Sequence, residues 1–197
     1  MSGLPPAVIL ACGRAVRMGG GDKCLLPLGN VSMLDRIIAT LLPQVSEILV
    51  NTNSNPALFR GAPVGVRGDV LPGRLGPLAG IHTAMLWAQE RGAEAVITVP
   101  GDAPFLPADL VARLVAASGD GHVAIASSAG NLHPVVGLWP RRLAPELQGC
   151  LESGMRRVRA WLEQCSFKIA EFEVKGLDPF LNINTKEDLQ RAAQLGL

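Results

Sequence analysis

The feature that most constrains this chain is an apolar run that ends abruptly in a glycine-rich, basic loop. Residues 7–11 are all apolar, and residues 12–23 then contain four glycines, two arginines and a lysine. Glycine lets backbone N–H groups approach an anion closely, and the cations neutralise the charge of that anion. The pattern therefore predicts a buried parallel strand over residues 7–10 that leads into a phosphate-binding turn.

This loop departs from the two common phosphate-binding patterns. Lys23 lies between Asp22 and Cys24, so the Gly-Lys-Ser/Thr step of a Walker A loop is missing, and G-x-G-x-x-G is also absent. The order over residues 10–23 is instead Leu-Ala-x-Gly-(x)3-Arg-Met-Gly-(x)2-Asp-Lys.

The composition favours one α/β domain over residues 1–197. Of the 197 residues, 48% are apolar and only 4% are aromatic, so an aliphatic core is expected. A domain of this length buries roughly 70% of its unfolded surface. Abundant alanine, valine and leucine suit helices that flank a mostly parallel, Rossmann-like sheet.

The charge and hydropathy of the chain argue against several classes of partner. The formal net charge is +1, which gives no electrostatic reason to expect binding to nucleic acid or to a membrane surface. The N-terminus lacks the pattern of a secretory signal, and no apolar run approaches the length of a membrane span. We therefore expect a cytoplasmic protein that binds neither nucleic acid nor membrane.

Strand patterns alternate with helical patterns along the chain, as in a parallel α/β sheet. Strands are expected at 7–10, 47–51, 64–67 and 95–99, with helices at 33–43, 77–91 and 106–117. Beyond them we expect strands at 122–126 and 135–139 joined by a polar loop, helices at 143–151 and 155–165, an edge strand at 167–174, and a last helix. Capping boxes at Ser32 to Asp35 and at Thr185 to Asp188 mark the first and last helices.

Five polar clusters follow strands or begin a helix at places that meet at one edge of such a sheet. They are residues 11–23, Asn51, Asp69, Asp102 and residues 182–184. Ligands bind beyond the carboxyl ends of strands in open α/β sheets, so these clusters predict one common site.

Asp102 is the candidate ligand of a Mg²⁺ ion, since this cation takes one or two carboxylates together with phosphate oxygens and water. The alternative is that Asp102 caps the helix that begins near Pro107. Lys23 and Arg17 are the candidate partners of a triphosphate, for which a solvated surface loop is the alternative.

The loop and five later segments occur together in an order that resembles the molybdenum cofactor guanylyltransferase family of nucleotidyltransferases. These segments are Gly-Pro-Leu-Ala-Gly at 76–80, Pro-Gly-Asp-Ala-Pro at 100–104, His-Pro at 133–134, Arg-Arg-Val at 156–158 and Asn-Ile-Asn-Thr at 182–185. The resemblance spans nearly the whole chain. It implies a single-domain nucleotidyltransferase fold and the transfer of GMP from GTP to molybdopterin, with Mg²⁺ as cofactor and pyrophosphate as product.

The resemblance also implies roles for individual residues. Backbone contacts to the nucleotide would come from Leu10, Ala11, Cys12 and Gly13, while Asn51 and Asp69 would contact the guanosine. Lys23 would hold phosphates and Asp102 would bind Mg²⁺, with Arg17 as the third catalytic residue. Arg156, Asn182 and Asn184, with Arg17, would lie nearer the pterin or the reacting phosphate. Transient contacts with cofactor-synthesis proteins and with molybdoenzyme apoproteins or their chaperones are also expected.

Local explanations compete with some of these roles. Asparagine readily satisfies backbone groups at the start of a helix, which would explain Asn182 and Asn184. Arg156 could belong to a solvated first helical turn, and His133 could be a buried, hydrogen-bonded histidine.

Cys12 leaves the choice of nucleotide open. The guanylyltransferase family usually has glycine here, and cytidylyltransferases that act on the same pterin typically have alanine. Guanine is favoured by the other motifs, with CTP as the alternative. A nucleotidyltransferase with another phosphorylated acceptor and a noncatalytic adaptor that delivers cofactor are the remaining interpretations.

Overall fold

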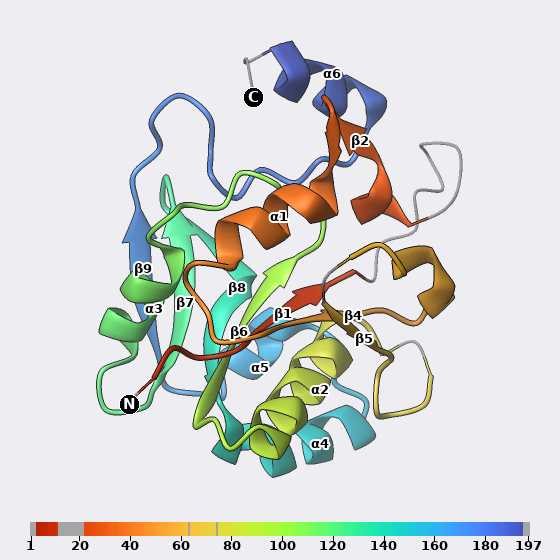
Figure 1. The fold of residues 1–197 in the computed structure, drawn as a ribbon. Helices are drawn as coiled ribbons and strands as arrows, with labels where there is room; N and C mark the ends of the chain where they lie inside the picture. The colour runs from red at the N-terminus through yellow and green to blue at the C-terminus, as the bar shows by residue number, and fades with distance from the viewer. Residues whose placement is uncertain (1–2, 12–21, 63, 74, 195–197) are drawn as a thin grey trace.

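A computed structural model of the chain describes residues 3–11, 22–62, 64–73 and 75–194, and in it a seven-stranded sheet lies between two layers of helices (Figure 1). The strand order is β5-β4-β1-β6-β8-β7-β9. The strands are β1 (Ala7–Leu10), β4 (Ile48–Asn51), β5 (Gly65–Arg67), β6 (Ala95–Pro100), β7 (Val123–Ser128), β8 (Asn131–Pro140) and β9 (Phe167–Phe172). β8 pairs antiparallel with both of its neighbours, and the other pairings in this sheet are parallel. The mostly parallel α/β fold that the sequence predicts is therefore confirmed.

The two faces of the sheet are covered by different helices. The helices are α1 (Met33–Leu41), α2 (Pro77–Glu90), α3 (Leu110–Ser118), α4 (Ala144–Glu152), α5 (Val158–Leu162) and α6 (Lys186–Gln194). Residues of α1 and α3 pack on one face, and residues of α2, α4 and α5 pack on the other. Alternate residues of β1 enter the two cores, with Ile9 in the first and Val8 in the second. Because both faces are covered, β1 is apolar at every position.

A smaller hairpin and the last helix extend one end of the molecule. β2 (Pro27–Leu28) pairs antiparallel with β3 (Val31–Ser32), and α6 packs beside this hairpin (Figure 1). α1 begins at the predicted capping box, since Ser32 Oγ accepts a hydrogen bond from Asp35 N and Asp35 Oδ2 accepts one from Ser32 N. The predicted capping box of α6 is also present between Thr185 and Asp188.

Four predicted elements, α3, α5, β7 and β8, have clearly different bounds in the structure. α3 begins at Leu110 rather than at residue 106, with Asp109 as its N-cap residue. The helix expected over residues 155–165 is only the short α5, because the N-cap residue Arg157 is still extended (φ −95°, ψ 123°). β7 and β8 are longer than expected, and the polar loop between them is reduced to a two-residue turn at Ala129 and Gly130.

That turn has positive φ at both positions, 46° at Ala129 and 75° at Gly130. Positive φ at both central residues is the geometry of a type I′ hairpin turn, whose twist matches that of the flanking strands. Among the residues that the structure describes, no helix is long and apolar enough to span a membrane.

Candidate functional site

A pocket of about 340 Å³ opens at the carboxyl ends of β1 and β6. It is lined by Leu10, Ala11, Lys23, Cys24, Gly76, Pro77, Pro100, Gly101, Asp102, Val135 and Asn182. Five of the predicted site residues (Leu10, Ala11, Lys23, Asp102 and Asn182) therefore share one cavity.

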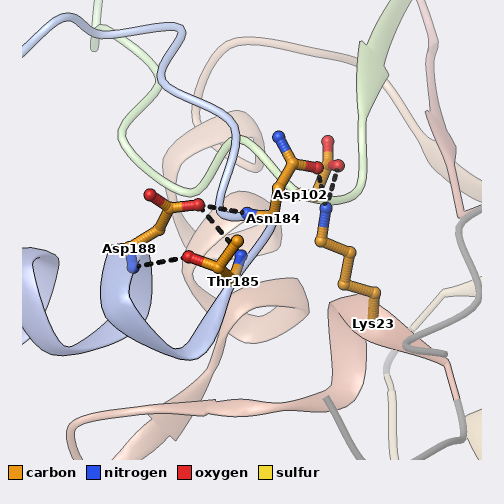
Figure 2. Close-up of polar contacts among 5 residues, drawn as sticks. All are labelled: Lys23, Asp102, Asn184, Thr185 and Asp188. Carbon is orange, nitrogen blue, oxygen red and sulfur yellow. Dashed lines mark hydrogen bonds and ion pairs between the residues drawn. The ribbon is translucent and has the colours of Figure 1, made fainter. Parts of the chain in front are cut away.

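Lys23 is the centre of the polar cluster beside this pocket (Figure 2). Its Nζ donates to Asp102 Oδ2 at 2.7 Å and to Asn184 Oδ1 at 2.5 Å. The lysine side chain is only 9% exposed, whereas that of Asp102 is 25% exposed. A nearly buried ammonium group is thus held by one carboxylate and one amide oxygen, and the carboxylate remains within reach of solvent.

The three residues of this cluster come from distant parts of the chain. Lys23 follows β1, Asp102 follows β6 directly, and Asn184 precedes α6. Ile183 N donates to Asp102 O at 2.9 Å, which fixes the segment before α6 against the end of β6. The interpretation of Asp102 as a helix cap is wrong, because Asp109 occupies the N-cap position of α3.

Close backbone packing at Gly101 places Asp102 beside the end of β1. Gly101 N donates to Leu10 O at 3.0 Å. A Cβ atom at Gly101 would lie 3.2 Å from Cys24 Cβ and 3.3 Å from Ala11 Cα, so a side chain would press the two strand ends apart. Cys24 packs next to Gly101 and lines the pocket, although it was not predicted from the sequence as a site residue.

The oxygen atoms of Asp102 and Asn184 fit a hard cation that takes its remaining ligands from other molecules. Asp102 Oδ2 faces Lys23, and Asp102 Oδ1 receives no hydrogen bond from the described residues. No group of three or more His, Cys, Asp or Glu residues that could enclose a metal occurs in the described part of the chain. One carboxylate and a nearby amide oxygen suit Mg²⁺, which completes its coordination with phosphate oxygens and water.

A second polar group lies at the carboxyl ends of β4 and β5. Asn51 is fully buried, and its Nδ2 donates to Asp69 Oδ1 at 3.1 Å and to Arg67 O at 3.3 Å. Asn53 Nδ2 donates to Asp69 Oδ2 at 2.7 Å, and Asp69 N donates to Asn53 Oδ1 at 2.8 Å. The structure therefore brings Asn51 and Asp69 together as predicted, and it adds Asn53, for which the polar run 51–55 after the strand was the available signal.

Asp22 connects this second group to Lys23. Its side chain is buried, and Ser54 Oγ donates to Asp22 Oδ1 at 2.6 Å. The residue that precedes Lys23 is thus tied to the segment that follows β4. Neither Asp22 nor Ser54 was selected as a site residue from the sequence.

Arg156 lies next to the pocket, but its guanidinium makes local contacts. Nη1 donates to Leu151 O at 2.8 Å and to Met155 O at 2.7 Å, where the carbonyl groups at the end of α4 need partners. Arg156 O would lie 3.8 Å from a Cβ atom at Gly76, a residue that lines the pocket. Arg156 precedes α5, so it does not belong to a first helical turn. The predicted residues Cys12, Gly13 and Arg17 lie outside the described part of the chain.

The sheet order and the pocket at the carboxyl ends of β1 and β6 define an open, mostly parallel α/β protein with a ligand site at one edge of its sheet. The MobA-like NTP transferase domain matches residues 7–167, and the chain belongs to this family.

Two relatives that are more than 40% identical to this chain are both named molybdenum cofactor guanylyltransferase. A molybdenum cofactor guanylyltransferase of Mesorhizobium japonicum is 44% identical over 195 residues, which cover 95% of this chain and 94% of the relative. The molybdenum cofactor guanylyltransferase of Rhodopseudomonas palustris (strain BisB5) is 42% identical over 197 residues, which cover 98% of this chain and 94% of the relative.

Solved structures share the fold at low sequence identity. Molybdopterin-guanine dinucleotide biosynthesis protein A from Archaeoglobus fulgidus has a TM-score of 0.76 at 21% identity and covers 97% of this chain and 98% of its own. A CMP:2-keto-3-deoxy-manno-octonic acid synthetase complexed with CTP has a TM-score of 0.73 at 14% identity, with 98% of both chains covered. Both likenesses concern the fold alone.

Proposed function

We propose that this protein transfers GMP from GTP to the phosphate of molybdopterin and releases pyrophosphate. The observation that carries the proposal is the convergence of Lys23, Asp102 and Asn184 beside the pocket, in a chain more than 40% identical to molybdenum cofactor guanylyltransferases over nearly its full length.

In this reaction an oxygen of the acceptor phosphate forms a bond to the α-phosphorus of GTP. The bond between the α-phosphorus and the bridging oxygen to the β-phosphate breaks, and its electron pair leaves with pyrophosphate. Negative charge thereby moves toward the equatorial oxygens and the leaving group, where fixed cations lower the barrier. Lys23 supplies such a cation, and its partly buried ion pair with Asp102 sets the position of its Nζ.

Asp102 and the amide oxygen of Asn184 are the groups that would hold Mg²⁺ with the phosphates. When bound, this ion neutralises phosphate charge. The side chain of Asp102 is partly exposed, so it can exchange part of its contact with Lys23 for a new ligand.

We assign the nucleotide to the β1 side of the pocket, the side on which β4 and β5 follow in the sheet. Backbone groups at Leu10 and Ala11 would lie against it, as would Cys12 and Gly13 in the predicted loop. Asn51 and Asp69 would contact the guanosine, with their relative position fixed by the hydrogen bond between them. Asn182, which also lines the pocket, would face the acceptor, while Arg17 and Arg156 remain predicted acceptor-side residues.

A transfer assay with purified protein, Mg²⁺ and molybdopterin tests this function. GTP and CTP are supplied separately and then in competition, and the dinucleotide product and pyrophosphate are both quantified. We expect the guanine dinucleotide as the main product, with pyrophosphate in equal amount. A preference for CTP would assign the chain to the cytidylyltransferases, and nucleotide binding without product would indicate a delivery adaptor. Product formation with another phosphorylated acceptor in place of molybdopterin would reject the pterin substrate.

A further inference from the structure

A second polar cluster, separate from Lys23, lies where β7, β8 and the segment before α6 meet. Ser128 is the last residue of β7 and is fully buried. Its Oγ donates to both carboxylate oxygens of Asp178 at 2.9 Å, and it lies 2.7 Å from His133 Nε2. His133 belongs to the His-Pro segment at 133–134 and has no predicted role in the reaction.

The number of protons in this cluster determines the tautomer of His133. Ser128 Oγ has one hydrogen, which it donates to the Asp178 carboxylate because a hydrogen bond to a charged acceptor is the stronger one. His133 Nε2 must then carry the proton that it shares with Ser128 Oγ. Burial lowers the pKa of His133, partly opposed by the Asp178 carboxylate, so the ring is neutral near pH 7 with an unprotonated Nδ1.

The same carboxylate organises the chain that leads to the pocket. Asp178 Oδ1 accepts a hydrogen bond from Phe180 N at 2.9 Å, and Asp178 O accepts one from Leu181 N at 3.1 Å. The Phe180 ring packs on His133, with 4.6 Å between ring centroids, and meets Phe172 edge-on. Asp178 thus fixes both the turn and the aromatic side chain that follows it.

The turn is followed directly by residues of the site. Asn182 lines the pocket, Ile183 N binds Asp102 O, and Asn184 binds Lys23. The segment 178–184 is therefore attached to the sheet at two points, by Asp178 to Ser128 at one end and by Ile183 and Asn184 at the other.

We propose that Asp178, through Ser128 and His133, is a positioning residue that sets the location of Asn182 and Asn184 for the acceptor molecule. The proposal rests on the proposed transferase function, because it assigns the segment 178–184 to the acceptor side of that site. Asn51 and Asp69 lie at the carboxyl ends of β4 and β5, and β1, β6 and β8 separate β4 from β7 in the sheet, so the nucleotide side is expected to be insensitive to the Asp178 cluster.

Three variants and one control test this role. Asp178→Ala removes the acceptor for Ser128 and Phe180, Asp178→Asn keeps the shape and an acceptor oxygen without the charge, and Ser128→Ala removes the hydroxyl that joins the cluster. Ser118→Ala is the matched control, because Ser118 is also buried and its Oγ makes one hydrogen bond, to Val115 O at the end of α3.

We expect Asp178→Ala to raise the KM and the dissociation constant for molybdopterin about tenfold, while both constants for GTP change less than about twofold. Asp178→Asn should recover most of the loss, since it restores the hydrogen-bond acceptor. Ser128→Ala should raise the KM and the dissociation constant for molybdopterin by a smaller factor, and Ser118→Ala should leave the constants for both substrates unchanged. An unchanged molybdopterin constant, or equal changes for both substrates, would overturn the proposal.

Two further measurements separate this proposal from the proposed function. Dissociation constants for GTP and for molybdopterin are measured by titration without turnover, so a chain that binds both but transfers nothing refutes the transferase function alone. Ring-nitrogen NMR of His133 should show the proton on Nε2 in the unsubstituted protein. A proton on Nδ1 would contradict the hydrogen-bond assignment on which Asp178 depends.

Discussion

Asp102 and Gly80 owe their importance to the backbone around them. Asp102 follows β6 at the point where Gly101 packs against Ala11, so its carboxylate reaches Lys23 across two strand ends. Gly80, in α2, lies against the buried amide of Asn51. The end of β1 lies beside Gly101, and the end of β4 lies beside Gly80, so a side chain at either glycine would meet a neighbouring strand.

Asp102→Asn is expected to lower the transfer rate at least about 100-fold, because the variant loses the charge that would hold Mg²⁺ in the proposed function but keeps an oxygen for Lys23. The melting temperature should change little. Rates and melting curves are compared with those of Asp109→Asn, a change at an exposed carboxylate 3.7 Å from Arg113. Activity retained in Asp102→Asn would remove the metal role.

Gly80→Ala is expected to destabilise the protein by about 1–3 kcal/mol, since overpacking of a filled core has costs in this range. The new Cβ would lie 2.7 Å from Asn51 Oδ1 and 2.9 Å from Leu10 Cδ2. Gly149→Ala is the control in α4, where a Cβ meets nothing within 4 Å and should stabilise the helix by about 0.5–1 kcal/mol. Urea unfolding and GTP titration measure both variants, and equal stability changes would contradict this account.

The placement of Lys23, Asn51, Asp69 and Asp102 at one edge of the sheet was predictable, because each of them ends a strand or follows one, and parallel strands deliver their carboxyl ends to one edge. The hydrogen bond between Lys23 and Asn184 could not be predicted from the sequence pattern, because 161 positions separate the two residues and no periodicity connects them. The sequence pattern predicted that residues 182–184 belong to the common site, and the family resemblance implied a place for Asn184 near the pterin or the reacting phosphate.

The hairpin of β7 and β8 shows why element bounds were harder to predict than element types. Its turn, Ala129-Gly130, lacks the asparagine or aspartate that usually marks a type I′ turn, so the sequence favoured a longer polar loop. The pairing of Ser128 with Asn131 is decided by tertiary contacts, including those of Ser128 with Asp178. Similarly, Pro107 suggested a helix start that the structure places at Leu110.

Ala129→Asn is expected to stabilise the protein by about 0.5–1 kcal/mol, because asparagine tolerates the left-handed region that costs alanine roughly 1 kcal/mol or more. Ala129 has φ 46° and its side chain is exposed, so no other contact should be lost. Thermal unfolding of Ala129→Asn is compared with that of Ala129→Val. The β-branched valine should destabilise the turn, and the reverse order of stabilities would refute the turn assignment.

We expect the stability of the whole molecule to depend on pH through a buried histidine, His82. His82, in α2, is 1% exposed, and neither ring nitrogen has a hydrogen-bond partner among the described residues. Burial lowers the pKa of His82 below its usual 6.5, and the carboxylates of Glu152 and Asp69 oppose this shift only in part. The folded protein therefore holds His82 in the neutral form near neutral pH.

Folding stability is expected to decrease as the pH falls below about 6.5, because the unfolded chain then binds a proton that the folded chain resists. His133, whose pKa is also lowered by burial, contributes in the same direction. His82→Leu should reduce this slope and raise stability near neutral pH by on the order of 1 kcal/mol, since it removes two unsatisfied nitrogens. Urea unfolding at several pH values measures the slope, and an unchanged slope in His82→Leu would reject this cause.

The reversed direction of β8 has a consequence for how new acceptors could be accommodated. Because β8 runs against β6 and β7, the tip of the hairpin at Ala129-Gly130 lies at the same edge of the sheet as the pocket, while β1, β4 and β5 are untouched by it. Insertions at this tip would add surface next to the proposed acceptor side and leave the proposed nucleotide side in place. The hairpin tip is thus a natural site for grafting loops that change which phosphate the enzyme modifies.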